Sequence, residues 1–121
     1  MAFTEGSNDG RISHGTENII IAAPSSNVRR IAKTISICNP SVCSGITVNL
    51  MLKNTSGNGA YRTFYTNTIE VRDTLIFGAN SEMFVLDSTD KSIVATLSGI
   101  TVFTAPATVR PDFISSYGDV S

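Results

Sequence analysis

The chain has 121 residues, which fits one domain with a single core. Charged residues make up 16% of it, against roughly 25% in an average soluble domain. Nine basic and ten acidic residues give a formal net charge of -1, which argues against a nucleic-acid-binding surface. No apolar stretch approaches the roughly 20 residues that span a bilayer, so we expect no membrane partner.

The first 17 residues form a polar segment rich in Gly, Ser, Asn and Asp, in which Phe3 and Ile12 are the large apolar side chains. A segment of this composition cannot form a core by itself. Its first residues, Met1 to Ser7, have neither a basic start nor an apolar run, so we expect no signal peptide and synthesis in a cytoplasm. We predict an N-terminal arm over residues 1–17.

Short β-type runs separated by turn residues follow. Asn18–Ala23 is predicted as the first strand, ended by Pro24. In Val28–Cys38, Ile31, Ile35 and Ile37 are predicted to share one face with Lys33, and Arg30, Thr34 and Ser36 the other. Ile46–Lys53 shows the clearest alternation of apolar and polar residues, which places its apolar side chains on one side of a strand.

Six further strands are predicted from the same signals: Tyr61–Tyr65, Thr68–Val71, Thr74–Phe77, a buried Met83–Leu86, Lys91–Leu97, and finally Ile100–Ala105 after a tight Ser98-Gly99 turn. Helix-forming runs are missing. We therefore predict an all-β fold, a single antiparallel β-sandwich of jelly-roll type with about eight strands over residues 18–105. Residues 106–121 are polar again, with Phe113, Ile114 and Tyr117 as isolated apolar side chains, and are predicted to form a C-terminal arm.

Cys38 and Cys43 lie five positions apart around a turn, where a disulfide is geometrically possible. A reducing compartment favours two buried or half-buried thiols instead. Zinc is disfavoured because a structural site uses four Cys or His ligands and His14 is the only histidine.

No catalytic constellation is recognisable. A hydrolase of the Ser or Cys type needs a base, and His14 lies in the polar N-terminal segment. Asp87-Ser88-Thr89-Asp90 offers too few oxygen ligands for calcium and is interpreted as a self-capping turn. We therefore expect no enzyme activity, no catalytic residue, no cofactor and no metal.

Tyr61, Phe64 and Tyr65 are the aromatic residues that could form a platform for a sugar. With strict alternation, Tyr61 and Tyr65 share one strand face and Phe64 takes the other, which favours ordinary packing. A glycan-binding module of a receptor-recognising tail component is kept as the alternative function.

Three stretches resemble a group of small β-sandwich virion proteins of tailed bacteriophages: Val28–Asn39, Ile46–Leu52 and Thr89–Ser98. In that group a strand ending in Cys-Asn precedes an alternating strand, and a late Gly-Asp-Ser-Ile turn leads into another strand. Here the late turn reads Thr-Asp-Lys-Ser-Ile, and the Pro-Ala-Gly turn before the first stretch is replaced by Ala-Pro-Ser-Ser. The resemblance covers about residues 18–105.

The resemblance implies a non-enzymatic, homo-oligomeric virion structural protein of the capsid-decorating, neck or tail-adaptor type, made in the host cytoplasm. Its implied partners are copies of itself and other capsid, neck or tail proteins. We expect the two arms to reach neighbouring subunits through Phe3, Ile12, Phe113, Ile114 and Tyr117. Deleting residues 1–16 or 110–121 should then abolish assembly and leave a folded core. The alternative is that both segments fold back on their own domain.

Overall fold

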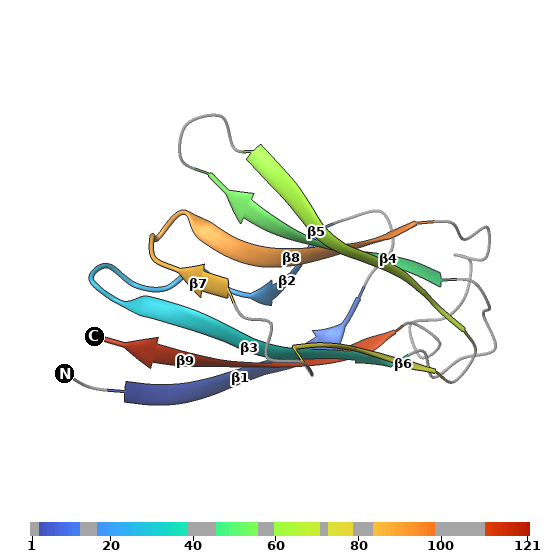
Figure 1. Ribbon diagram of the computed structural model, residues 1–121, viewed down its shortest axis with the longest axis horizontal. Helices are drawn as coiled ribbons and strands as arrows, with labels where there is room; N and C mark the ends of the chain where they lie inside the picture. The colour runs from blue at the N-terminus through green and yellow to red at the C-terminus, as the bar shows by residue number, and fades with distance from the viewer. Residues whose placement is uncertain are drawn as a thin grey trace.

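The computed structural model describes residues 3–12, 17–38, 46–55, 60–70, 73–78, 84–98 and 111–121, and these form two layered antiparallel sheets (Figure 1). Sheet A has the order β1 (Phe3–Arg11), β9 (Asp112–Val120), β3 (Arg29–Cys38) and β6 (Thr74–Phe77), and β7 (Phe84–Leu86) also pairs with β3. Sheet B has the order β2 (Asn18–Ile21), β8 (Lys91–Ser98), β4 (Ile46–Asn54) and β5 (Ala60–Ile69). The predicted all-β antiparallel sandwich is confirmed.

The core lies between the two sheets and is built from alternate residues of the strands. In β4, the buried Val48 and Leu50 alternate with Thr47 and Asn49, which are only half-buried, as the alternation predicted. Isoleucine dominates the core, because a β-branched side chain packs well on a pleated surface. The largest fully buried side chains are Ile12, Ile20, Ile21, Ile35, Ile37, Leu50, Ile69, Leu86, Ile93, Val48 and Val94.

A register shift in β3 changes the faces predicted for that strand. The pairing of β3 with β9 is interrupted between Ala32 and Ile35. Because an extra residue reverses the alternation, Ile31 lies on the outside of sheet A and Ile35 lies in the core. The sequence prediction that Ile31 and Ile35 share one face is therefore wrong.

The segment predicted as two strands, Tyr61–Tyr65 and Thr68–Val71, is one continuous strand, β5. It pairs with β4 along its whole length, with one register shift opposite Leu50 and Met51. Strands predicted at Thr74–Phe77, Met83–Leu86 and Lys91–Leu97 appear as β6, β7 and β8 with small changes of bounds. The predicted strand Ile100–Ala105 lies outside the described residues.

The two segments expected to be arms pair with each other instead. β1 and β9 form a ladder without a register shift from Phe3 opposite Val120 to Arg11 opposite Asp112, and β9 also pairs with β3. The structure thus follows the alternative, in which both segments fold back on their own domain. The physical reason is that the two polar segments, unable to fold alone, pair their backbones with each other, and β9 also pairs with β3, while Ile12 and Phe113 become buried in the core.

Glycines on one strand lie beneath aromatic rings of the other. A Cβ at Gly6 would lie 2.5 Å from Cζ of Tyr117, and one at Gly10 would lie 3.1 Å from Cε1 of Phe113. On the opposite face, a Cβ at Gly118 would lie 2.8 Å from the Phe3 ring. These close approaches fix the register of β1 on β9, because a shifted pairing would remove the glycines from beneath the rings.

Buried polar groups join this strand pair to sheet B. Ser115 is fully buried, and its hydroxyl donates a 2.8 Å hydrogen bond to the carbonyl oxygen of Ile20, where the register of β2 on β8 shifts. Asn8 donates from its side-chain amide to the same oxygen over 3.3 Å. The two side chains satisfy a carbonyl that the irregular ladder leaves free.

Arg30 holds the other end of β9. Its guanidinium donates to both carboxylate oxygens of Asp119 over 2.8 and 3.0 Å and to the carbonyl oxygen of Ala22 over 2.8 Å. It also stacks on the Tyr117 ring, 4.0 Å from the ring centroid. The bidentate pair with Asp119 raises the pKa of Arg30 above its ordinary value. Because Phe3 lies opposite Val120, the start of β1 and the end of β9 lie at the same end of the sandwich (Figure 1).

Candidate interaction surface

Most of the exposed large apolar side chains lie on the outer face of sheet A. Among the described residues, the large hydrophobic side chains that are 45% exposed or more are Phe3, Ile19, Tyr61, Ile76, Val85 and Ile114. Four of these, Phe3, Ile76, Val85 and Ile114, belong to strands of sheet A and point away from its core. We call them, together with the half-buried Ile31 and Val120, the apolar face of sheet A.

The strand register brings these side chains together in two rows. Ile114 of β9 lies opposite Ser36 of β3, and Ser36 lies opposite Ile76 of β6, so all three share one face. The second row runs from Phe3, whose ring covers Gly118, through Ile31 to Val85 of β7. The two rows are separated along β9 by four residues and face the same side.

One end of the apolar face is hollowed. Ile31, Val85, Val120 and Arg29 line a depression of about 190 Å³ there. Charged pairs surround the apolar side chains: Lys33 Nζ lies 3.7 Å from Oε1 of Glu5 and 5.3 Å from the centroid of the Phe3 ring. Arg11 Nε lies 3.3 Å from Oδ1 of Asp112 at the other end. An apolar centre with a polar rim is the usual anatomy of a protein–protein interface.

The outer face of sheet B carries mainly polar side chains that bond to one another. Thr47 and Thr68 lie opposite each other with their hydroxyl oxygens 3.2 Å apart, and Thr66 donates a 3.0 Å hydrogen bond to Oδ1 of Asn49. Ile19, Val94 and Met51 lie opposite one another across β2, β8 and β4 and form an apolar row on this face, in which Ile19 is exposed and Val94 is fully buried. Away from this row, the outer face of sheet B is polar.

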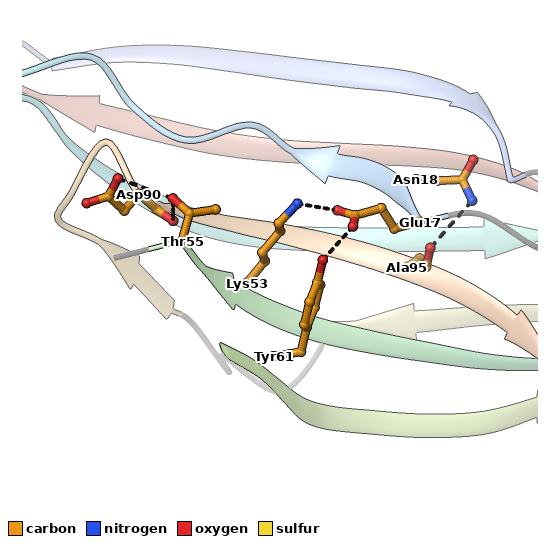
Figure 2. Close-up of polar contacts among 7 residues, drawn as sticks. All are labelled: Glu17, Asn18, Lys53, Thr55, Tyr61, Asp90 and Ala95. Carbon is orange, nitrogen blue, oxygen red and sulfur yellow. Dashed lines mark hydrogen bonds and ion pairs between the residues drawn. The ribbon is translucent and has the colours of Figure 1, made fainter. Parts of the chain in front are cut away.

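Glu17 joins two strands at one end of sheet B (Figure 2). Its carboxylate accepts a 2.9 Å hydrogen bond from Lys53 Nζ and a 2.6 Å hydrogen bond from the Tyr61 hydroxyl. These two bonds, the one from Lys53 above all, lower the pKa of Glu17 below its ordinary value, and the same pairing raises the pKa of Lys53. Figure 2 also shows Thr55 donating to Asp90, which ties the end of β4 to the turn before β8.

The structure separates the two tyrosines of the predicted glycan platform. The register shift in β5 falls beside Phe64, so Tyr61 lies opposite Lys53 on the outer face while Tyr65 lies opposite Leu50 on the core side. The Tyr65 and Phe64 rings both pack edge-on against Phe77, with centroids 5.5 and 5.2 Å from it. The prediction that Tyr61 and Tyr65 share one face is wrong, because the bulge reverses the alternation.

The five residues predicted to dock into neighbours fall into three groups. Ile12 and Phe113 are 0% and 5% exposed and fill the protein's own core. Tyr117 is half-buried between Gly6 and Arg30. Phe3 and Ile114, at 55% and 63% exposed, lie on the apolar face of sheet A and are open to a neighbour.

Sequence reasoning missed Ile76 and Val85 as surface residues. Both lie in short apolar runs, and the run containing Val85 was predicted to be a buried strand. The usable signal was in β6, where Leu75 and Phe77 alternate with Thr74 and Ile76. An isoleucine at an outward position of an amphipathic strand marks an apolar outer face.

Side chains of the metal-ligating types do not cluster in the described part of the chain. No group of three or more His, Cys, Asp or Glu side chains comes together among the described residues. Cys38 is a half-buried free thiol, while Cys43 and His14 lie outside the described part of the chain. A polar depression of about 430 Å³ lies between the Ser25–Arg29 and Asp87–Thr89 turns. Within the same described segments, no helix is long and apolar enough to cross a membrane.

Comparison with known proteins gives structural neighbours only. No family description and no curated protein matches the sequence. A chain from the structure of tomato aspermy virus aligns over 96% of this chain and 76% of its own length, with 13% identity and a TM-score of 0.39. A chain from infectious bursal disease virus, Gx strain, aligns over 98% of this chain but only 40% of its own length, with 12% identity and a TM-score of 0.43. Likeness at this level does not define a shared fold.

Proposed function

We propose that this chain is a non-enzymatic structural component of a virus particle that packs onto neighbouring subunits through the apolar face of sheet A. The observation that carries the proposal is the gathering of Phe3, Ile76, Val85 and Ile114 on one side of the sandwich. Apolar patches of this kind on a small domain mark surfaces that another molecule covers. The low charge content of 16% points the same way.

The particle itself is taken from the sequence resemblance. The stretches Val28–Asn39, Ile46–Leu52 and Thr89–Ser98 resemble small virion β-sandwich proteins of tailed bacteriophages. They correspond to β3, β4 and β8 with its preceding turn, which form the interior of the two sheets. We therefore propose a head-decorating or head–tail connecting protein that works as an oligomer, with synthesis in the host cytoplasm. The glycan-binding alternative is not retained, because Tyr61 and Tyr65 lie on opposite sides of sheet B.

The test uses purified particles of the virus that encodes the chain. Quantitative mass spectrometry should find the chain in them at a fixed copy number, in the hundreds for head decoration and a small multiple of six for a connector. Particles without the chain would overturn the proposal.

A matched pair of variants then tests the face. Ile114→Thr, on sheet A, should reduce incorporation several-fold, whereas Ile19→Thr, on sheet B, should leave it unchanged, since the two isoleucines are 63% and 55% exposed. Equal incorporation of the two variants would show that the assembly contact does not use the apolar face of sheet A.

A further inference from the structure

Among the described strands, β1 forms a regular outer edge of sheet A. β1 pairs on one side with β9 through nine successive residue pairs without a register shift. Within the described residues, no strand pairs with its second side. The backbone donors and acceptors along that side are therefore available to another strand.

The other outer strands are shorter or interrupted. β2 has four residues and a register shift, and β5 has ten residues with a shift opposite Leu50 and Met51. β6 and β7 have four and three residues. Short strands, bulges, Pro and charged side chains are the devices that keep sheet edges from pairing with other chains. β1 is long and has no bulge and no Pro, and its charged residues are of both signs, Glu5, Asp9 and Arg11, so they can be matched as well as repelled.

We propose that β1 pairs with β1 of a second copy of this chain, antiparallel and about a two-fold axis at Asn8, so that sheet A continues from one copy into the next. The inference rests on the proposed function in taking a second copy as the neighbour that assembly requires. It also places the two apolar faces on the same side, where they form one surface of double width for the next component of the particle.

Charge selects the register. The outer faces of the two copies lie on one side only if each outward residue of β1 pairs with an outward residue of the other β1. In such an antiparallel pairing the two-fold axis passes through a residue position and not between two successive positions. With Asn8 on the axis, Glu5 lies opposite Arg11 of the second copy, and the symmetry makes this opposite-charge pair twice. With Ser7 on the axis, Glu5 instead lies opposite Asp9 of the second copy, giving two like-charge pairs.

The groups that would meet remain accessible in the single chain. The Glu5 side chain is 72% exposed beside Lys33, at the long distance of 3.7 Å. The Arg11 side chain is 51% exposed beside Asp112. Neither intramolecular pair buries its members, so each can add a contact across the new edge.

The test is charge reversal in the full chain, with self-association measured by sedimentation equilibrium. Glu5→Arg and Arg11→Glu should each weaken association by roughly tenfold or more, because each creates two like-charge pairs. The double variant Glu5→Arg/Arg11→Glu restores opposite charges and should return association to near the original value. Arg62→Glu, an equal charge change at an exposed position of β5, is the matched control and should have no effect.

A measurement without variants accompanies it. Hydrogen exchange of the unmodified chain should slow at β1 amides as concentration rises, while amides of β5 stay unchanged. A monomer at all concentrations, β1 exchange independent of concentration, or no rescue in the double variant would each overturn the inference.

The two proposals fail separately. A chain present in particles but monomeric when isolated keeps the proposed function and loses the β1 pairing. A chain that dimerises with charge-reversal rescue but is absent from particles keeps the pairing and loses the function.

Discussion

The two outer faces of the sandwich differ in the side chains that they show to solvent. On sheet B, the polar side chains bond to each other within the protein, as in the Thr47–Thr68 and Thr66–Asn49 pairs. On sheet A, isoleucine, valine and phenylalanine stand exposed with no covering element among the described residues. The sandwich thus has one outer face whose polar side chains hydrogen-bond to one another and one outer face whose apolar side chains are uncovered among the described residues.

This difference is the physical basis of the proposed function. Exposed apolar area is unfavourable by roughly 25 cal/mol per Å², so a face that keeps it in the single chain is stabilised when another molecule covers it. A polar, internally bonded face gains little from being covered, because its hydrogen bonds are already made. The contrast therefore supports the proposal that assembly uses the apolar face of sheet A.

The change with the largest expected effect is a deletion that takes a central strand out of sheet A. Deleting residues 112–121 takes β9 from between β1 and β3, together with Phe113 and the buried Ser115. We expect the cooperative urea-unfolding transition to disappear. A cooperatively folding truncated chain, as the arm interpretation predicted, would show that β9 is dispensable and would break the assignment of the face.

Neighbouring residues of β9 separate the inside of sheet A from its outside. Phe113→Ala should destabilise the protein by about 3–5 kcal/mol, because it leaves a cavity in the core. Ile114→Ala, one position further on the opposite face, should change stability by no more than about 0.5 kcal/mol. Urea unfolding monitored by circular dichroism measures both, and similar losses would mean that Ile114 is not a surface residue.

The smallest expected effect concerns the polar face. The pKa of Glu17 is lowered from its ordinary value of 4.5, first by the hydrogen bond from Lys53 and then by that from Tyr61. Its stabilising contribution is therefore complete above pH 4.5 and is lost as the pH falls through the lowered pKa. The NMR shifts of the Tyr61 ring should change in that acid range, and Glu17→Gln should remove the change. If the pH-dependent change in the Tyr61 ring shifts persists in the Glu17→Gln variant, Glu17 is not its cause.

The sequence predicted those parts of the fold in which the alternation is uninterrupted. In β4 the pattern identified both the strand and its buried face, since each second residue contributes to the core. In β3 and β5, bulges reverse the alternation, and a pattern with a fixed period of two cannot show where an extra residue is inserted. The misplaced faces of Ile31 and Tyr65 both arise in this way.

The strand pair β1–β9 could not be predicted from local pattern because its stability is not local. Phe3-to-Arg11 contains few apolar residues, and its partner lies at the other end of the chain. One usable signal was the equal spacing of Gly6 and Gly10 with Phe113 and Tyr117, which fits glycines beneath rings on opposite strands. Of the candidate surface, Phe3 and Ile114 were predicted, while Ile76 and Val85 required the three-dimensional register.

The pairing of the first strand with the last also sets the order of events during synthesis. The Ser115 hydroxyl lies 3.3 Å from the carbonyl oxygen of Asn8, 107 positions earlier in the chain, so sheet A cannot close until β9 has left the ribosome. Contacts of such long range are slow to form, because the entropy of closing the loop is lost before the contacts are gained. Until then β1 is a nascent strand without its partner, and a chaperone that covers such an exposed strand would act before any assembly contact can form.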